Sequence, residues 1–224
     1  MSNTSGFPGS PKLLRGGLVQ LNPTSRAIVD VVVFQYNPDT VTRTLQPRGM
    51  AAEPGDRLEV LRLTGPPHET IKLEAEIDAA DQLEHPDDSR NNPVTQYGLL
   101  PVLSALEALI TPSSAHLMAA DALLAQGMLE IAPVEAPLVV LVWGVNRVLP
   151  VLLSNLTITE EAFDTHLRPI RAKASIECKV LTVNDLPPSH LGYQLYLSQR
   201  RRAESLAALV GGTDVRQLGL EHLP

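Results

Sequence analysis

The sequence contains one cysteine, Cys178, among its 224 residues, and only 4% of its residues are aromatic. A single cysteine excludes an internal disulfide and a zinc site built on cysteine ligands. Scarce aromatic residues mean that the core must consist mainly of Leu, Val, Ala and Ile. Cys178 falls on the apolar side of a predicted strand, where a thiol is expected to act as a small buried hydrophobic group.

Positive charge and long apolar runs are also scarce. The sequence has 18 Lys and Arg residues and 25 Asp and Glu residues, so its formal net charge is −7. This negative charge argues against nucleic acid as a partner. No apolar run approaches the ~20 residues that a membrane-spanning helix needs. The first residues are polar and lack the apolar segment of a signal peptide, so we expect a cytoplasmic protein without a membrane segment.

The most informative stretch covers residues 136–183 and predicts three successive antiparallel strands, at residues 138–143, 148–159 and 170–183. Gly144 and Asn146 favour a tight first turn because both residue types tolerate left-handed backbone conformations. Pro169 lacks a backbone donor, so we expect it at the start of the third strand or on an edge. That strand alternates apolar and polar residues, which predicts one buried and one wet face.

The rest of the sequence predicts an α+β, β-rich fold. Residues 1–15 are expected to form a disordered arm. Further strands are predicted at residues 17–21, 27–36, 41–45, 58–63 and 70–77, and an acidic loop at residues 78–92. A helical insert covers about residues 93–128 of a domain at residues 16–183. Residues 184–224 form a C-terminal extension with a helix at 191–210, whose apolar stripe includes Leu206 and Leu209.

The chain offers weak candidates for chemistry. His85, Asp87 and Asp88 could hold a metal ion, but their spacing fits no known metal-binding loop, and a solvated loop is the simpler interpretation. No nucleophile elbow, phosphate-binding loop or dinucleotide fingerprint is present in the sequence. We therefore predict no enzyme and no catalytic, metal or cofactor site. A metal-dependent hydrolase, and a carbohydrate-binding module that uses Trp143 and Tyr97, remain as alternatives.

Several short motifs occur in a defined order along the chain. Phe34, Gln35, Tyr36, Asn37 and Pro38 form an F-x-[FY]-N-P sequence. Further elements follow in the order Trp143-Gly144, Phe163 and Pro169-Ile170-Arg171-Ala172. Over about residues 16–183 this combination resembles the tube and baseplate adaptor proteins of contractile injection systems, which are phage-tail-like particles. We read the motif residues as structural, with Arg171 pairing with an acid across the sheet or across a subunit boundary.

The resemblance implies a tube-protein-like fold, in which a strongly bent sheet or β-barrel is flanked by a helix. It also implies a homohexameric ring that acts as an adaptor or tube initiator between the spike hub and the inner tube. The expected partners are further copies of the chain, the spike or hub protein, the inner tube protein, and baseplate wedge or sheath components. The assembled particle can be released from the cell. The inner tube subunit itself is the alternative within this family.

The C-terminal extension departs from the family pattern. Many members carry a LysM module after the barrel, but residues 184–224 lack the tryptophan and the other marks of that module. Instead, the predicted helix carries the basic triplet Arg200, Arg201 and Arg202 on an otherwise acidic chain. A charged solvated face is the simpler interpretation of this triplet. The alternative is a surface that binds a neighbouring baseplate or sheath component of the particle.

Overall fold

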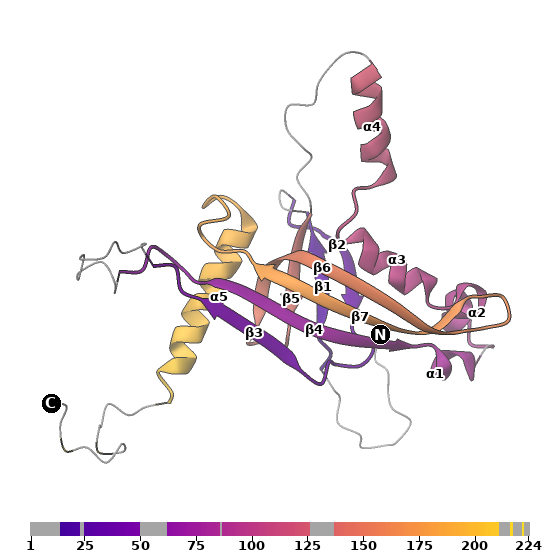
Figure 1. Cartoon of the computed structure of the whole chain (residues 1–224), viewed down its shortest axis with the longest axis horizontal. Coiled ribbons are helices and arrows are strands. Elements are labelled where there is room, and N and C mark those ends of the chain that lie inside the picture. Colours follow the sequence, from indigo (N-terminus) through magenta and orange to yellow (C-terminus); the bar gives the residue numbers. More distant parts are fainter. Residues whose placement is uncertain are drawn as a thin grey trace.

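The computed structural model describes residues 14–22, 25–49, 62–85, 87–125 and 137–210, together with Arg216 and Glu221. Within these ranges the chain is α+β, with a seven-stranded antiparallel sheet and a C-terminal helix (Figure 1). Across the sheet the strands follow in the order β2 (Ile28–Val33), β1 (Gly17–Leu21), β5 (Leu138–Val142), β6 (Val148–Phe163), β7 (Pro169–Val180), β4 (His68–Asp78) and β3 (Val41–Gln46).

The sheet is open and does not close into the barrel that was one of the two expectations. β2 and β3 form its edges, and among the described strands each of them pairs with one neighbour only. In Figure 1 the strands β1, β2 and β5 run steeply, whereas β3, β4 and β7 run obliquely across the view, so the sheet is strongly twisted. An open sheet of this kind leaves two rows of backbone groups available for pairing.

The predicted three-strand meander forms the middle of the sheet. Gly144 has a φ of 73° and lies in the turn between β5 and β6, and Pro169 is the first residue of β7. The alternation of β7 is also confirmed, because its buried residues fall at every second position and face the core. These buried residues are Ala172, Ala174, Ile176, Cys178 and Val180, and Thr182 beyond the strand is buried as well.

The described helices between β4 and β5 are α1 (Ala80–Leu83), a 3-10 turn (Ser89–Asn91), α2 (Asn92–Tyr97), α3 (Leu100–Ala108) and α4 (Ser114–Ala125). α1 and α2 lie at one end of the long strands, whereas α4 stands away from the sheet (Figure 1). Of these, α3 buries Leu103 and Leu106 in the hydrophobic core. Residues 78–92 were expected to be a loop but contain α1 and the 3-10 turn, because Asp78 accepts a hydrogen bond from the Ala80 amide (2.7 Å) at the start of α1.

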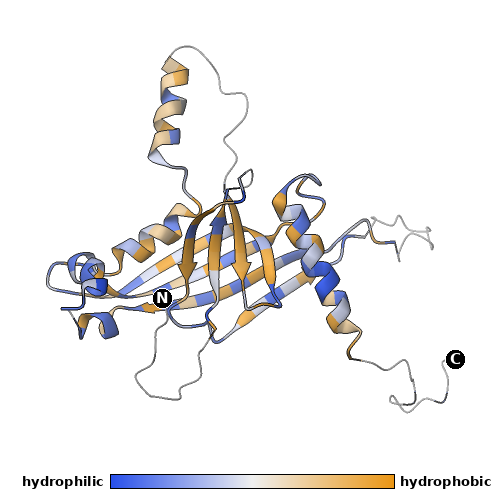
Figure 2. Cartoon of the chain, turned by 180° about the vertical axis from the view of Figure 1, so that it is seen from behind, coloured by the Kyte–Doolittle hydropathy of each residue, from blue (hydrophilic) through white to orange (hydrophobic). Residues whose placement is uncertain are grey.

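The C-terminal helix α5 (Leu191–Ala207) packs on the sheet through its first half. Gly192 is buried beside Leu138 of β5, and Tyr196 packs against the hydrophobic core. The predicted apolar stripe fails at its distal end, because Leu206 is 44% and Leu209 79% exposed. The distal end of α5 extends past the sheet (Figure 2).

Four other predictions fall wholly or partly on residues outside the described ranges. These are the N-terminal arm up to residue 13, most of the strand predicted at residues 58–63, the end of the helical insert after Ala125, and the tail after Val210 apart from Arg216 and Glu221. Of the 58–63 strand, Leu63 forms an isolated antiparallel bridge with Gly49. None of the described helices is long and apolar enough to cross a lipid bilayer.

Candidate functional site

Contacts link the motif segments, which are far apart in the sequence, one to the next: Phe34 packs against Trp143, Gln35 binds Asp78, and Asp78 binds Arg171. We call this group the motif cluster and define it as residues 34–38, Trp143-Gly144, residues 169–172 and the Asp78 that connects them. Phe34 follows edge strand β2, Trp143 follows β5, and residues 169–172 begin β7. Strand pairing therefore brings together segments that lie more than a hundred residues apart.

Phe34 and Trp143 form the apolar part of the motif cluster. Their ring centroids lie 6.4 Å apart at an interplanar angle of 54°, and Phe34 is 3% exposed. Gly16 lies against both rings, and a Cβ at this position would stand 2.7 Å from a carbon of the Trp143 indole. Trp143 is half-buried and packs against the hydrophobic core at the end of its strand, so Phe34 and Gly16 cover part of its ring.

The side chain of Gln35, the residue after Phe34, forms hydrogen bonds with the backbone at the end of β4. The Gln35 side chain donates to the Asp78 carbonyl (2.6 Å) and accepts from the Asp78 amide (2.9 Å), so it satisfies both backbone groups at the end of β4. Asn37 makes an equivalent pair of contacts on the other side, because it accepts from the Gly16 amide (2.9 Å) and donates to the Leu14 carbonyl (2.8 Å). These amide side chains fix the motif loop to two separate parts of the chain.

Arg171 pairs with an acid across the sheet within the same chain. Its Nε lies 2.9 Å from Asp78 Oδ2, and the two residues are direct neighbours in the register of β4 and β7. A hydrogen bond from the Ala80 backbone amide, followed by the contact with Arg171, holds the pKa of Asp78 below its ordinary value. The remaining motif residues lie beside this pair: Pro38, Pro169 and Ala172 are buried, and Phe163 is 48% exposed opposite Pro169.

A second contact ties the β6–β7 turn to the helices. Arg168 donates to the Thr95 carbonyl (3.0 Å) and the Gln96 carbonyl (2.7 Å) near the end of α2. Asp164 holds Arg168 in turn, accepting from its Nε at 2.6 Å. A guanidinium at the carboxyl end of a helix satisfies carbonyls that have no partner within the helix. The sequence analysis did not single out Arg168, and only its position before the Pro169 motif could have indicated it.

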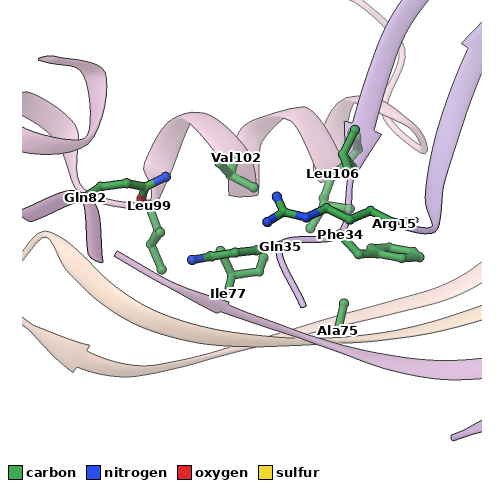
Figure 3. A pocket seen from close by; sticks show the side chains of 11 residues that line it. Arg15, Phe34, Gln35, Ala75, Ile77, Gln82, Leu99, Val102 and Leu106 are labelled. Atoms are coloured by element: carbon green, nitrogen blue, oxygen red, sulfur yellow. The ribbon is translucent and has the colours of Figure 1, made fainter. Parts of the chain in front are cut away.

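Two hollows adjoin the motif cluster. One is a cavity of about 180 Å³ between α3 and strands β2 and β4, and Figure 3 shows Arg15 and Gln35 beside the apolar side chains that line it. The other, of about 360 Å³, lies on the wet face of the sheet and is lined by charged residues together with Tyr36: Glu76, Asp78, Glu161, Arg171 and Lys173.

The charges of the second hollow are arranged in pairs. Lys173 contacts Glu161 (3.3 Å) and Glu76 (3.7 Å), and its pKa is raised by these carboxylates, that of Glu161 first. Burial and the nearby Asp81 raise the pKa of Tyr36, so this phenol also keeps its proton at neutral pH. The pKa shifts at this hollow thus hold each affected group in its usual charge state. Groups that keep their usual charge can hold neighbouring strands in register, but they are poorly suited to transfer protons.

The metal-ligand candidates lie apart from the motif cluster. Asp88 binds its neighbour Arg90, and this contact lowers the pKa of Asp88 to about 2. In the part of the chain that the structure describes, no group of three or more His, Cys, Asp or Glu side chains could hold a metal ion. Tyr97, the other residue of the carbohydrate alternative, lies on α2 and is 50% exposed.

The three arginines of α5 do not form one patch. Arg202 donates to Asn146 Oδ1 (2.8 Å from Nε) in the β5–β6 turn, whereas Arg200 lies 3.2 Å from Glu204 on the helix itself. Arg201 is exposed. Successive residues on a helix point about 100° apart, which separates the three side chains. Arg202 therefore helps to hold α5 on the sheet, and Arg200 and Arg201 remain on the surface.

Comparison of the sequence with protein-family models and with curated proteins gives no match to either.

The Asp78 contacts predict a pH effect. Because the folded-state pKa of Asp78 is depressed, its contribution to stability is present above the ordinary value of 3.8 and is lost as pH falls through the folded-state value. We expect Asp78→Asn to lower the free energy of unfolding at pH 7 by about 1 kcal/mol, since the amide keeps the Ala80 contact and loses the charge. The difference from wild type should shrink at low pH.

Urea unfolding measured at several pH values checks this expectation. Glu74→Gln is the matched control, because Glu74 lies on the same face of β4 opposite the uncharged Ser175. An Asp78→Asn deficit that is as large at pH 3 as at pH 7 would contradict the assigned role of this carboxylate.

Proposed function

We propose that this chain is a structural, non-enzymatic component of a contractile injection system baseplate. In this role six copies form a ring that acts as an adaptor or tube initiator between the spike hub and the inner tube. The ring also contacts baseplate wedge or sheath components, and it is assembled in the cytoplasm into a particle that can be released. Support comes from the ordered motifs, which occupy connected positions in the fold and make contacts that stabilise it.

The observation that carries the proposal is the open sheet with an apolar edge strand. Ile28 is 65%, Val29 57%, Val31 46% and Val33 51% exposed on β2. Soluble proteins protect long apolar edge strands because such strands pair readily with other chains. Ring closure is one way to cover such an edge in every copy, since each subunit of a closed ring has a neighbour that can pack against this edge.

The wet face of the long strands is consistent with a surface that remains in contact with water in the assembly. β4 and β7 present alternating charges there, with cross-strand pairs such as Lys72–Glu177 (3.0 Å) and Arg171–Asp78. Exposed pairs like these contribute little to stability, typically about 0–1 kcal/mol each. Their abundance on this face is better explained by a need to keep it hydrated, as the wall of an aqueous channel would require.

The C-terminal helix favours the adaptor over the inner tube subunit within this proposal. α5 is fixed to the sheet by Arg202 and by Gln199, whose side chain accepts from the Val148 amide (3.1 Å) and donates to the Asn146 carbonyl (2.9 Å). Arg200 and Arg201 are exposed on its distal half. An anchored helix that presents basic residues suits contact with an acidic wedge or sheath component.

Electron microscopy and light scattering of the purified protein test the proposal. We expect discrete rings with six-fold symmetry and a mass six times that of the 24.2 kDa chain. Particles assembled without this chain should lack the junction between spike and tube. Long stacked tubes would instead favour the inner tube subunit. A monomer that is dispensable for particle assembly would contradict both assignments.

A further inference from the structure

Edge strand β2 has a sequence that favours pairing with further strands. Five of its six residues are Ile or Val, and Asp30 is the only charged residue from Ile28 to Val33. Segments of about six residues with high β propensity and little charge add readily to other chains. Among the described strands, β2 pairs with β1 alone, so its other edge is open. An edge of this kind normally carries a feature that prevents uncontrolled pairing.

One hydrogen bond shows which backbone amides of β2 face the open edge. The Phe34 amide, directly after β2, donates to the carbonyl of Gly16, directly before β1, at 2.9 Å. Amide directions alternate along a strand of an antiparallel pair, so the Val32 amide also points toward β1. The Val31 and Val33 amides therefore point away from β1, and a strand added at this edge would have to pair with them.

The Asp30 carboxylate already occupies one of these two amides. Asp30 Oδ1 accepts a hydrogen bond from the Val31 amide at 2.7 Å. An incoming strand would have to displace this carboxylate or leave its own carbonyl at this position without a donor. Either course costs free energy, because a backbone carbonyl that loses its contact with water needs a new partner. The incoming backbone would also meet the negative charge of Asp30 at the edge.

A β-bulge lies directly before Asp30. In the register of β1 and β2, Gln20 lies opposite Asp30 and Leu21 lies opposite Ile28, so Val29 has no partner on β1. Bulges of this kind bend a strand and interrupt its ladder, and they are a common way to protect an edge. The bulge therefore interrupts the first part of the open edge, and the Asp30 carboxylate blocks the amide that follows it.

We propose that Asp30 is a gatekeeper of this edge, which means that its carboxylate occupies the Val31 amide and prevents further strands from extending the sheet. The excluded strands include β2 of a second copy, which has the same apolar sequence. Single charges inside or beside apolar strands limit aggregation in this way. This role is independent of the ring proposed above, because it concerns the backbone of β2 and leaves its apolar side chains open to a neighbour.

Three substitutions in the purified full chain test the role of Asp30. Asp30→Ala removes the acceptor, so we expect open-ended assemblies that bind thioflavin T at a roughly two- to ten-fold lower protein concentration than wild type, the range for one hydrogen bond. Asp30→Asn keeps a side-chain oxygen as acceptor and should assemble like wild type. Glu107→Ala removes an exposed carboxylate of α3 instead, so it controls for net charge. Sedimentation velocity gives the size distribution of each variant.

A proline at position 31 shows whether the new assemblies use the Val31 amide. Proline has no backbone amide hydrogen, and it is tolerated in edge strands where that amide would face outward. The double variant Asp30→Ala/Val31→Pro should therefore return to the assembly state of wild type. Circular dichroism and thermal unfolding check that each variant is folded. If the proline variant unfolds, the comparison of Asp30→Ala with Asp30→Asn decides.

Three results would overturn the gatekeeper role. Asp30→Ala that assembles like wild type would reduce the contact with the Val31 amide to a local one. Assemblies that persist in a folded Asp30→Ala/Val31→Pro variant would show that they do not use this amide. Equal assembly of Asp30→Ala, Asp30→Asn and Glu107→Ala would assign the effect to net charge. The proposed function is judged separately, by whether the wild-type chain forms six-fold rings, and its failure would leave the role of Asp30 unchanged.

Discussion

Gly98→Ala is expected to be among the most damaging single substitutions in this chain. Gly98 has φ 62° and ψ −139°, a conformation that is essentially restricted to glycine. A Cβ there would stand 2.5 Å from the Pro169 carbonyl oxygen and 3.1 Å from Arg168 Cβ. Backbone strain of about 1–3 kcal/mol and overpacking of similar size should together lower the free energy of unfolding by about 2–6 kcal/mol.

The damage should be centred on α3. The Leu99 amide, directly after Gly98, donates to the Pro169 carbonyl (2.8 Å), and Leu99 is 1% exposed. Displacing that carbonyl would loosen both the start of β7 and the helix whose Leu103 and Leu106 fill the core. Hydrogen exchange should therefore show lost protection in α3 and at the start of β7 before other regions.

Gly144→Ala provides a matched comparison. Gly144 also has a positive φ of 73°, but a Cβ at this position meets nothing within 4 Å. Its cost should be limited to the left-handed backbone, about 1 kcal/mol. Thermal unfolding of the monomer should place Gly98→Ala about 4–24 °C below wild type and Gly144→Ala about 2–4 °C below. Equal losses for the two variants would show that contact with Pro169 is unimportant.

The second large effect is expected from Phe34→Ala. Phe34 is 3% exposed and packs against Trp143, so truncation leaves a cavity at the end of edge strand β2. Phe→Ala substitutions in a core typically cost about 3–5 kcal/mol. The loss should also release the Gln35 contacts with Asp78, because Phe34 anchors the loop that carries Gln35.

Trp143 is the only tryptophan in the chain, so its fluorescence reports directly on this packing. Phe34→Ala should shift the emission of the folded protein to the red, since the indole loses its apolar neighbour. Phe163→Ala removes a 48% exposed ring from the end of β6 and should change neither the emission nor the stability by more than about 1 kcal/mol. An unchanged emission spectrum in folded Phe34→Ala would contradict the assigned packing.

Single strands and turns could be predicted from the sequence, because the residues that determine them lie next to one another in the chain. The alternation of β7 predicts its buried face, and Gly144 predicts the turn between β5 and β6. The expectation that Arg171 meets an acid across the sheet or a subunit boundary followed from its place on a wet strand, but its partner Asp78 lies 93 residues away.

The order of the strands could not be predicted in the same way. Nothing in residues 17–21 indicates that β1 lies between β2 and β5, because that choice depends on long-range pairing. The contacts that link Phe34, Trp143 and Arg171 depend on that strand order, so they could not be predicted from the sequence either. The contact of Arg202 could not be predicted for a related reason: adjacency in sequence does not place side chains together on a helix, and Arg202 binds Asn146 in the β5–β6 turn.

The strand order also dictates when the sheet can form. β1 pairs with β2 and β3 pairs with β4, so each pair can close once its own residues have been synthesised. Yet the two pairs have no contact in the strand ladder with each other, because β5, β6 and β7 lie between them. During synthesis on the ribosome the two pairs can join into one sheet only after β7, which ends at Val180, has emerged. Until then each exposes an inner edge, a period in which chaperones or an early partner could act on the nascent chain.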